Sequence, residues 1–135
     1  MNKLAFVLVA LAGLIVAATA AASPTTLHLT EKQTFQHYVD KGPKGESAGD
    51  IRTFGGTVFA GGKRVGHDQI RCVVGATCSA QVWLAGGSLI SPAFVATGPS
   101  FTAKITAGTG TYRGAHGTVT VVGGPVSHYT VQLDR

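Results

Sequence analysis

Beyond residue 22, short segments rich in Thr and Val are separated by glycine-rich turns. No window of this part shows the spacing of an amphipathic helix, and Leu is scarce. Short segments of this kind predict β-strands joined by tight turns. Eight strands are predicted, over residues 26–38, 51–59, 64–74, 78–85, 88–96, 100–106, 116–122 and 127–134.

A uniform series of short strands indicates an all-β fold, either a sandwich or an up-and-down barrel. We favour an antiparallel β-barrel of eight strands, because closure removes the unpaired edges that so apolar a chain would otherwise expose. The longest polar segment, residues 40–50, is predicted to be a mobile loop. The glycine-rich run over residues 108–114 is predicted to be a tight turn between two strands.

Residues 1–22 have the composition of a leader. Lys3 precedes an almost unbroken apolar run over residues 4–18, and three alanines, Ala20 to Ala22, precede Ser23. This order is typical of a signal peptide, with cleavage after Ala20 or Ala22, and predicts a secreted or periplasmic protein. The alternative is an uncleaved membrane anchor, since the run approaches the length of a membrane span. We expect a single barrel domain over residues 23–135.

The net charge and the distribution of basic residues indicate which partners to expect. Loss of the leader would remove Lys3 and leave ten basic and six acidic residues, a formal net charge of +4. The basic residues are dispersed and do not form a stripe with interleaved aromatic residues, so nucleic acid is not an expected partner. No stretch beyond the leader is long and apolar enough to cross a bilayer, so no membrane contact is expected there.

The two cysteines fix the register of one hairpin. A pair of cysteines in an exported chain predicts a disulfide between Cys72 and Cys78. Because side chains alternate along strands, the disulfide shares its face with Asp68, Ile70, Ala80, Val82 and Leu84. This face is mostly apolar and is expected to point inward. The opposite face carries His67, Gln69, Arg71, Ser79, Gln81 and Trp83.

The same alternation predicts which side chains of the last three strands point inward. They are Phe101, Ala103, Ile105, Val119, Val121, Tyr129, Val131 and Leu133. Asp68 is then a carboxylate on an apolar inner face, which leaves two interpretations: a solvated position at the barrel rim, or a position inside a pocket. Trp83 faces outward as an oligomer contact or a stacking platform, unless the register slips by one residue and places it in the core.

Few residues are suited to catalysis. Glu31 and Asp68 are the strand carboxylates that could reach an interior and form an acid–base pair, and residues 23–135 contain no Asn. The run Gly45-Glu46-Ser47-Ala48-Gly49 has Gly-x-Ser-x-Gly spacing, but it lies in the polar 40–50 segment with no helix predicted after it, so it does not indicate a nucleophile elbow. The chain has no dinucleotide-binding glycine pattern. Its five histidines lack metal-site spacing. We therefore expect no cofactor and no metal, and a hydrolase or redox enzyme is not favoured.

Residues 105–117 read ITAGTGTYRGAHG and resemble the glycine signature of the allene oxide cyclase barrel and of dirigent-like proteins. The signature positions here are Gly108, Gly110, Tyr112, Gly114 and Gly117. Ala107 stands in place of the first glycine of the signature, and His116 in place of an arginine. The segment from Gly49-Asp50 to Gly66, and the two cysteines followed by Leu84-Ala85-Gly86-Gly87, are similar to further motifs of small secreted bacterial members.

This resemblance implies an eight-stranded antiparallel barrel with an apolar lumen, often assembled as dimers or trimers. Members cyclise or isomerise a hydrophobic substrate, or steer a radical coupling. The resemblance places His28 and Thr30 where plant cyclases have a Glu and an Asn on the first strand. It points to Asp68 and Arg113 as the counterparts of the Asp and Arg residues in the pocket of dirigent proteins.

Two functions follow as hypotheses. In the first, the lumen binds a small hydrophobic ligand and steers its cyclisation or coupling. The catalytic candidates are then Asp68, Glu31 and Arg113, and the ligand-binding candidates are Asp68, Val82, Phe101 and Tyr129. A lumen for such a ligand should enclose roughly 300 Å³ or more. In the second, the protein is a non-catalytic extracellular barrel that associates with further copies through Trp83.

Overall fold

The computed structural model describes residues 24–134, so the predicted leader lies outside the described residues. The strands are β1 (Thr25–Val39), β2 (Ile51–Ala60), β3 (Lys63–Val73), β4 (Cys78–Leu84), β5 (Gly87–Phe94), β6 (Ser100–Ile105), β7 (Ala107–Gly110), β8 (His116–Val122) and β9 (Ser127–Asp134). The described part of the chain is all-β, and it has no helix that is long and apolar enough to span a bilayer.

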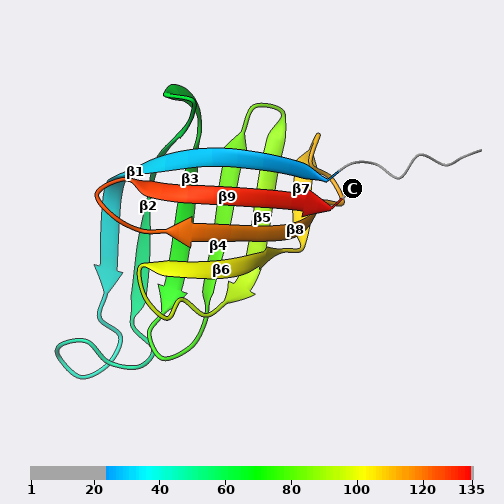
Figure 1. Cartoon of the computed structure of the whole chain (residues 1–135). Coiled ribbons are helices and arrows are strands. Elements are labelled where there is room, and N and C mark those ends of the chain that lie inside the picture. Colours follow the sequence, from blue (N-terminus) through cyan, green and yellow to red (C-terminus); the bar gives the residue numbers. More distant parts are fainter. Residues whose placement is uncertain (1–23, 135) are drawn as a thin grey trace, which may run out of the picture.

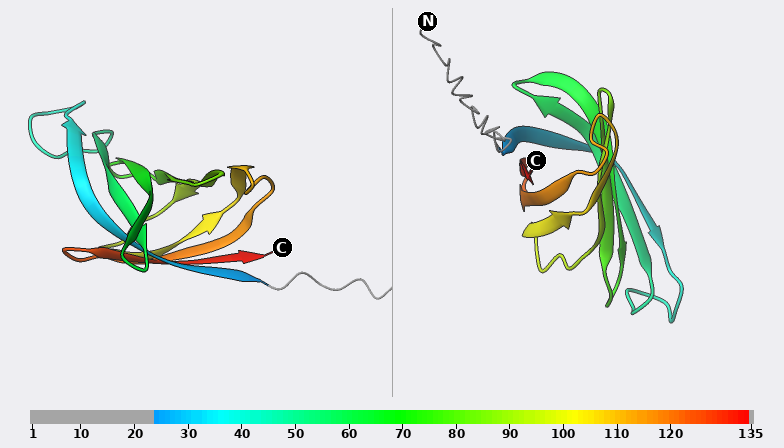
Figure 2. Two further views of the ribbon diagram at one scale, coloured as in Figure 1. Left: turned by 90° about the horizontal axis from the view of Figure 1, so that it is seen from above. Right: turned by 90° about the vertical axis from the view of Figure 1, so that its right-hand side faces the viewer.

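All nine strands belong to one antiparallel sheet, in the order β6-β8-β9-β1-β2-β3-β4-β5-β7. The sheet curls into a nearly closed barrel, with β6, β8 and β9 crossing in front of β2–β5 (Figure 1). β1 takes part in both halves of the barrel. Its first part pairs with β9 as far as Glu31, and its second part bends away along β2 (Figure 2).

Closure of the barrel explains why the structure has nine strands where eight were predicted. Residues 100–110 run as two strands, β6 and β7, with Thr106 between them. β6 pairs with β8, whereas β7 pairs with β5, and the Thr106 N–H donates a hydrogen bond to the Ile90 carbonyl. The assignment of residues 108–114 to a turn was therefore wrong for residues 108–110. The turn itself comprises residues 111–114.

Glycine is required where β7 ends. Gly110 has a φ of 60°, and a Cβ at this position would collide with the Gly86 carbonyl oxygen. The left-handed conformation is open to glycine at little cost. The backbone of β7 can therefore approach the β4–β5 turn closely, and the Thr111 N–H donates to that same carbonyl.

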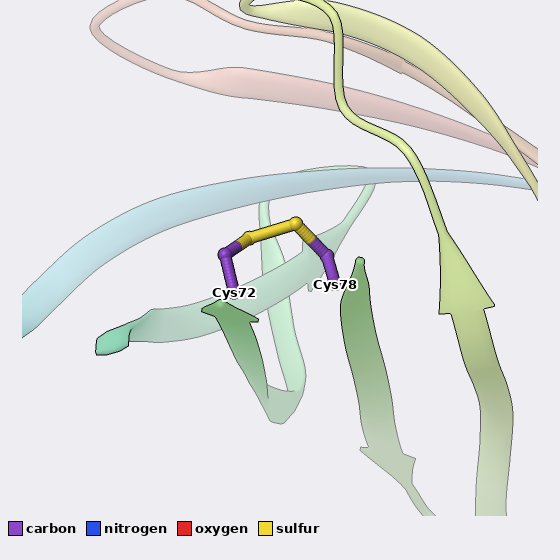
Figure 3. Close-up of a disulfide and its surroundings, with 2 residues drawn as sticks. All are labelled: Cys72 and Cys78. Atoms are coloured by element: carbon purple, nitrogen blue, oxygen red, sulfur yellow. A yellow bond between two sulfur atoms is a disulfide. The ribbon is translucent and has the colours of Figure 1, made fainter. Parts of the chain in front are cut away.

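The disulfide between Cys72 and Cys78 is present and joins β3 to β4 as predicted (Figure 3). The two residues are directly paired across the hairpin. The predicted inner face is also confirmed, since Ile70, Cys78, Val131 and Leu133 are buried in the core. On the opposite face, His67 stacks on Trp83, which places the tryptophan outside the barrel.

Candidate functional site

Asp68 lies inside the barrel and is only 2% exposed, so it occupies the interior and not the rim. It extends from the middle of β3, where alternation points it inward. One carboxylate oxygen accepts a hydrogen bond from the Gly56 N–H of β2 at 2.8 Å, and the other accepts one from the Tyr129 hydroxyl of β9 at 2.6 Å. These bonds join opposite walls of the barrel, because β9 and β3 are separated in the sheet by β1 and β2.

Glu31 is the second buried carboxyl group of the interior, with 6% of its surface exposed. It lies on β1, the strand between β9 and β2. Gly56 separates the two acids. Its N–H binds Asp68, and a Cβ in its place would collide first with the Lys32 carbonyl oxygen of β1 and also with Glu31 Oε1. Glycine at position 56 therefore allows the backbones of β1 and β2 to approach closely and leaves room for the Glu31 carboxyl group.

Burial raises the pKa of both acids. Loss of hydration raises the pKa of Glu31 from 4.5 to about 7; the negative charge of Asp68 adds to this effect, and the Ser127 hydroxyl partly offsets it. Burial also raises the pKa of Asp68, against the hydrogen bonds from Tyr129 and Gly56. Near neutral pH, Glu31 is therefore poised between its neutral and charged forms.

Tyr129 remains a neutral hydrogen-bond donor. Its pKa is raised well above the usual range, first by burial and then by the charge of Asp68 and the hydrogen bond to it. The three groups together form a proton-holding cluster, which we call the acidic cluster: Glu31, Asp68 and Tyr129. An acid–base pair whose pKa lies near the working pH is suited to proton transfer.

Two members of the acidic cluster, Asp68 and Tyr129, border a small apolar cavity of about 30 Å³, whereas Glu31 is not part of its lining. Asp68, Val82, Phe101 and Tyr129, the ligand-binding candidates of the sequence, all line it. The remaining lining is Ile70, Ala80, Phe94, Ala103, Val119 and Val121. The cavity has space for about one water molecule, far less than the roughly 300 Å³ expected of a lumen for a hydrophobic ligand. The lumen is therefore almost filled by side chains.

Two stacked rings account for much of this filling. Phe94 is the last residue of β5 and Phe101 the second residue of β6, and their centroids are 5.1 Å apart with planes inclined by 13°. The exposed segment of residues 95–99 connects them. The ring pair thus sits at the two ends of a short surface loop, and a movement of that loop would change the volume of the lumen.

The other predicted residues lie elsewhere. Arg113 is exposed in the β7–β8 turn and lines a separate surface pocket with Asp134. His28 and Thr30 alternate with the buried Leu29 and Glu31, so they point away from the interior. Among residues 24–134, no three His, Cys, Asp or Glu side chains gather closely enough to hold a metal ion.

Three residues at the site were not singled out from the sequence. Gly56 appeared to be one of many strand glycines, Ser127 was a strand-end serine, and Phe94 lay in a segment whose inward face was not assigned. Alternation from the buried Leu89 would point Phe94 outward, and an irregularity in the pairing of β4 with β5, where Ala80 pairs with Ser91 but Cys78 with Phe94, brings it into the core. The roles of Gly56 and Ser127 depend on the pairing of β2 with β3 and of β9 with β1.

Comparison with solved structures gives clear matches. A structure described as pyocyanin demethylase has a TM-score of 0.72 and 28% sequence identity, covering 81% of this chain and 99% of that one. The pterocarpan synthase dirigent protein PsPTS1 has a TM-score of 0.61 and 16% identity, covering 85% of this chain and 97% of that one. The corresponding protein GePTS1 has a TM-score of 0.54 and 15% identity, covering 82% and 88%. No protein-family model and no curated protein matches the sequence.

Proposed function

We propose, for a chain that folds as a dirigent-like barrel, that its lumen binds a small, flat, hydrophobic molecule and moves a proton on it. The acidic cluster is the observation that carries this proposal. Two carboxyl groups and a tyrosine are buried in the interior, and the cavity that Asp68 and Tyr129 line has no Lys, Arg or His in its lining. Buried acids without cations are costly to a fold, and such perturbed groups gather at functional sites.

The chemistry that the cluster supports is an isomerisation or cyclisation. One carboxylate takes a proton from the ligand, and the neutral carboxyl group beside it gives a proton to another atom of the ligand. The number of protons is unchanged at the end, so no co-reactant is needed. The Tyr129 hydroxyl keeps Asp68 in place and can turn toward a ligand oxygen. An apolar lumen would exclude water from a reactive intermediate.

Access of the ligand requires the Phe94–Phe101 pair to separate. A flat aromatic ligand could take the place of one ring and stack on the other, which favours offset parallel geometry. The names of the similar structures support a ligand of this kind, since one is a demethylase of pyocyanin and two are pterocarpan synthase dirigent proteins. We further propose that residues 1–22 direct export, with which the disulfide is compatible.

Binding of flat aromatic probes tests the proposal. Pyocyanin, naphthalene and flavone are titrated into the chain lacking residues 1–22 by calorimetry. At least one is expected to bind with a stoichiometry of one. Ala103→Leu, which fills the cavity from β6, should abolish binding, whereas Thr102→Leu on the exposed face of the same strand should not. Failure of all three probes to bind, or equal binding by both variants, would contradict a ligand-binding lumen.

The role of the cluster has a separate test. The affinity of a bound probe should change with pH around 7 in the unaltered chain, and Glu31→Gln should remove that dependence. Asp68→Asn should weaken binding of a probe that carries a hydrogen-bond donor and leave naphthalene unaffected. A pH dependence that persists in Glu31→Gln would show that Glu31 does not act on the ligand.

The second candidate function is a non-catalytic structural barrel, and the filled lumen is the observation that favours it. A cavity of only about 30 Å³ is what a barrel built only for stability would have. The two functions differ in the binding experiment, because a structural barrel binds none of the probes at any pH.

A further inference from the structure

A groove of about 180 Å³ lies on the outer face of β3, β4 and β5, on the side of the sheet opposite to the acidic cluster. Its lining includes Gln69, Arg71, Ser79, Gln81, Trp83 and Ile90. These side chains alternate with the inward residues of the same strands, so the groove does not communicate with the lumen. It is smaller than a pocket for a drug-sized molecule and comparable with a single sugar ring.

Trp83, the one tryptophan of the sequence, supplies an aromatic wall of this groove. It is half-buried, and the His67 ring stacks on it with centroids 4.9 Å apart and planes 13° apart. His67 is its cross-strand partner on β3. The indole is thus held in one orientation before any ligand arrives. A flat apolar ring with fixed orientation is a suitable surface for the C–H face of a sugar.

Polar groups border the aromatic wall, and one of them is fixed by the fold. The Gln81 Nε2 donates a hydrogen bond to the buried Ser88 Oγ at 2.9 Å, and Ser88 in turn bonds Thr109 of β7. This arrangement leaves the Gln81 amide oxygen as an acceptor for a ligand hydroxyl. Gln69 and Ser79 add further groups that can donate and accept.

The groove is positively charged. Arg71 is exposed and forms no ion pair within residues 24–134. None of the six carboxylates of the chain lines the groove. Glu31 and Asp68 lie in the lumen, and the other four lie in the 40–50 segment or near the C-terminus. Two copies packed face to face would oppose their Arg71 residues with no acid between them, so the charge favours an anionic ligand over a second copy.

We infer that this groove binds a hexuronic acid, a sugar ring that carries a carboxylate, either free or as the terminal unit of an acidic polysaccharide. The sugar ring stacks on Trp83, its hydroxyl groups bond the Gln81 and Gln69 amides, and its carboxylate pairs with the Arg71 guanidinium. Guanidinium and carboxylate can form two parallel hydrogen bonds. The site is independent of the proposed function of the lumen.

Fluorescence of Trp83 tests the inference directly, because no other tryptophan contributes. Glucuronate is titrated into the chain lacking residues 1–22, and glucose serves as the uncharged comparison. Glucuronate should change the emission in a saturable manner, and glucose should bind at least about tenfold more weakly because it lacks the charge-assisted pair. Equal responses to the two sugars, or no saturable response to glucuronate, would overturn the inference.

Two arginine variants distinguish a specific ion pair with Arg71 from a general effect of positive charge. Arg71→Gln should weaken glucuronate binding about tenfold or more, whereas Arg64→Gln, which removes the same charge from an exposed position at the start of β3, should leave it unchanged. Equal losses in both variants would overturn the inference. Asp68→Asn should also leave glucuronate binding unchanged, so that failure of the lumen proposal can be distinguished from failure of this one.

Two further measurements identify the source of the ligand and exclude a second copy. Tighter binding of digalacturonate than of galacturonate would indicate the end of a polysaccharide, and equal binding would indicate the free sugar acid. Sedimentation at micromolar concentration should show no association that Trp83→Ala abolishes. An oligomer that Trp83→Ala dissociates, and whose formation prevents glucuronate binding, would show that the groove is an interface between copies and would overturn the inference.

Discussion

Replacement of Glu31 by Gln should make the stability of the barrel less dependent on pH. The folded state raises the pKa of Glu31 from 4.5 to about 7, mainly because the side chain is buried. The folded protein therefore holds this proton more tightly than the unfolded chain does. Its contribution to stability is complete below pH 4.5, and it is lost as the pH rises through about 7.

The magnitude follows from the two pKa values. Each pH unit between them corresponds to about 1.4 kcal/mol, so ionisation of Glu31 lowers the free energy of unfolding by at most about 3 kcal/mol. The glutamine side chain of the variant has nearly the same shape as a neutral glutamic acid and cannot ionise. We expect the two proteins to be equally stable at pH 4.5, and the variant to be more stable by up to about 3 kcal/mol at pH 8.

Urea unfolding at pH 4.5, 5.5, 6.5, 7.5 and 8.5, followed by circular dichroism, measures this difference. Subtraction of one pH curve from the other cancels the contributions of groups that titrate alike in both proteins. An equal fall in stability for both proteins between pH 4.5 and 8.5 would refute the assigned burial of Glu31. Asp68→Asn provides a second check, because removal of the neighbouring charge should shift the Glu31 transition toward lower pH.

Three further predictions concern the disulfide, the glycine at the end of β7 and the buried carboxylate Asp50. Joint replacement of Cys72 and Cys78 by Ser should lower the free energy of unfolding by about 2 kcal/mol, since the closed loop is short, and an unchanged melting temperature would contradict this. Gly110→Val should impair folding because of its positive φ and the adjacent Gly86 carbonyl, whereas Gly98→Val, in an open loop, should melt normally. Asp50→Asn should speed hydrogen exchange at the Lys41 and Ser47 amides that donate to Asp50, with no change in β9. In the unaltered chain, the hydrogen bond from Tyr38, followed by that from the Lys41 amide, lowers the pKa of Asp50 to about 2. The hydrogen bonds to the Asp50 carboxylate should therefore be intact above pH 3.8 and be lost as the pH falls through about 2.

The sequence contained enough information for the strands and for most of the inner face. The spacing of the cysteines set the register of β3 against β4, and alternation then placed Ile70 inside and Trp83 outside. Local patterns failed where backbone pairing was not local. Residues 107–110 have the composition of a turn, yet they pair with β5, which lies about twenty residues earlier in the chain, because closure of the barrel leaves the edge of β5 to be filled.

The candidate site was predicted less completely, and the reason is physical. Asp68 could be assigned to the inner face from alternation, but a buried carboxylate is stable only if donors reach it. Its donors, the Gly56 amide and the Tyr129 hydroxyl, lie 12 and 61 residues away in the sequence. No local sequence pattern predicts such partners. Whether Asp68 lies at the rim or in the interior could therefore not be decided without the fold. The filling of the lumen by Phe94 and Phe101 depends in the same way on side-chain packing.

The acidic cluster favours a ligand-binding function, whereas the filled lumen favours a structural barrel. A barrel selected for stability alone would gain from apolar side chains at positions 31 and 68, because each buried acid opposes folding at neutral pH. The fold instead supplies Asp68 with two hydrogen-bond donors, the Gly56 N–H and the Tyr129 hydroxyl. The neighbouring cavity is about 30 Å³ and is lined in part by the stacked Phe94 and Phe101 rings, which flank a surface loop. Buried acids that are supplied with hydrogen-bond donors, beside a cavity lined by two stacked rings, support the proposal that the lumen opens for a ligand.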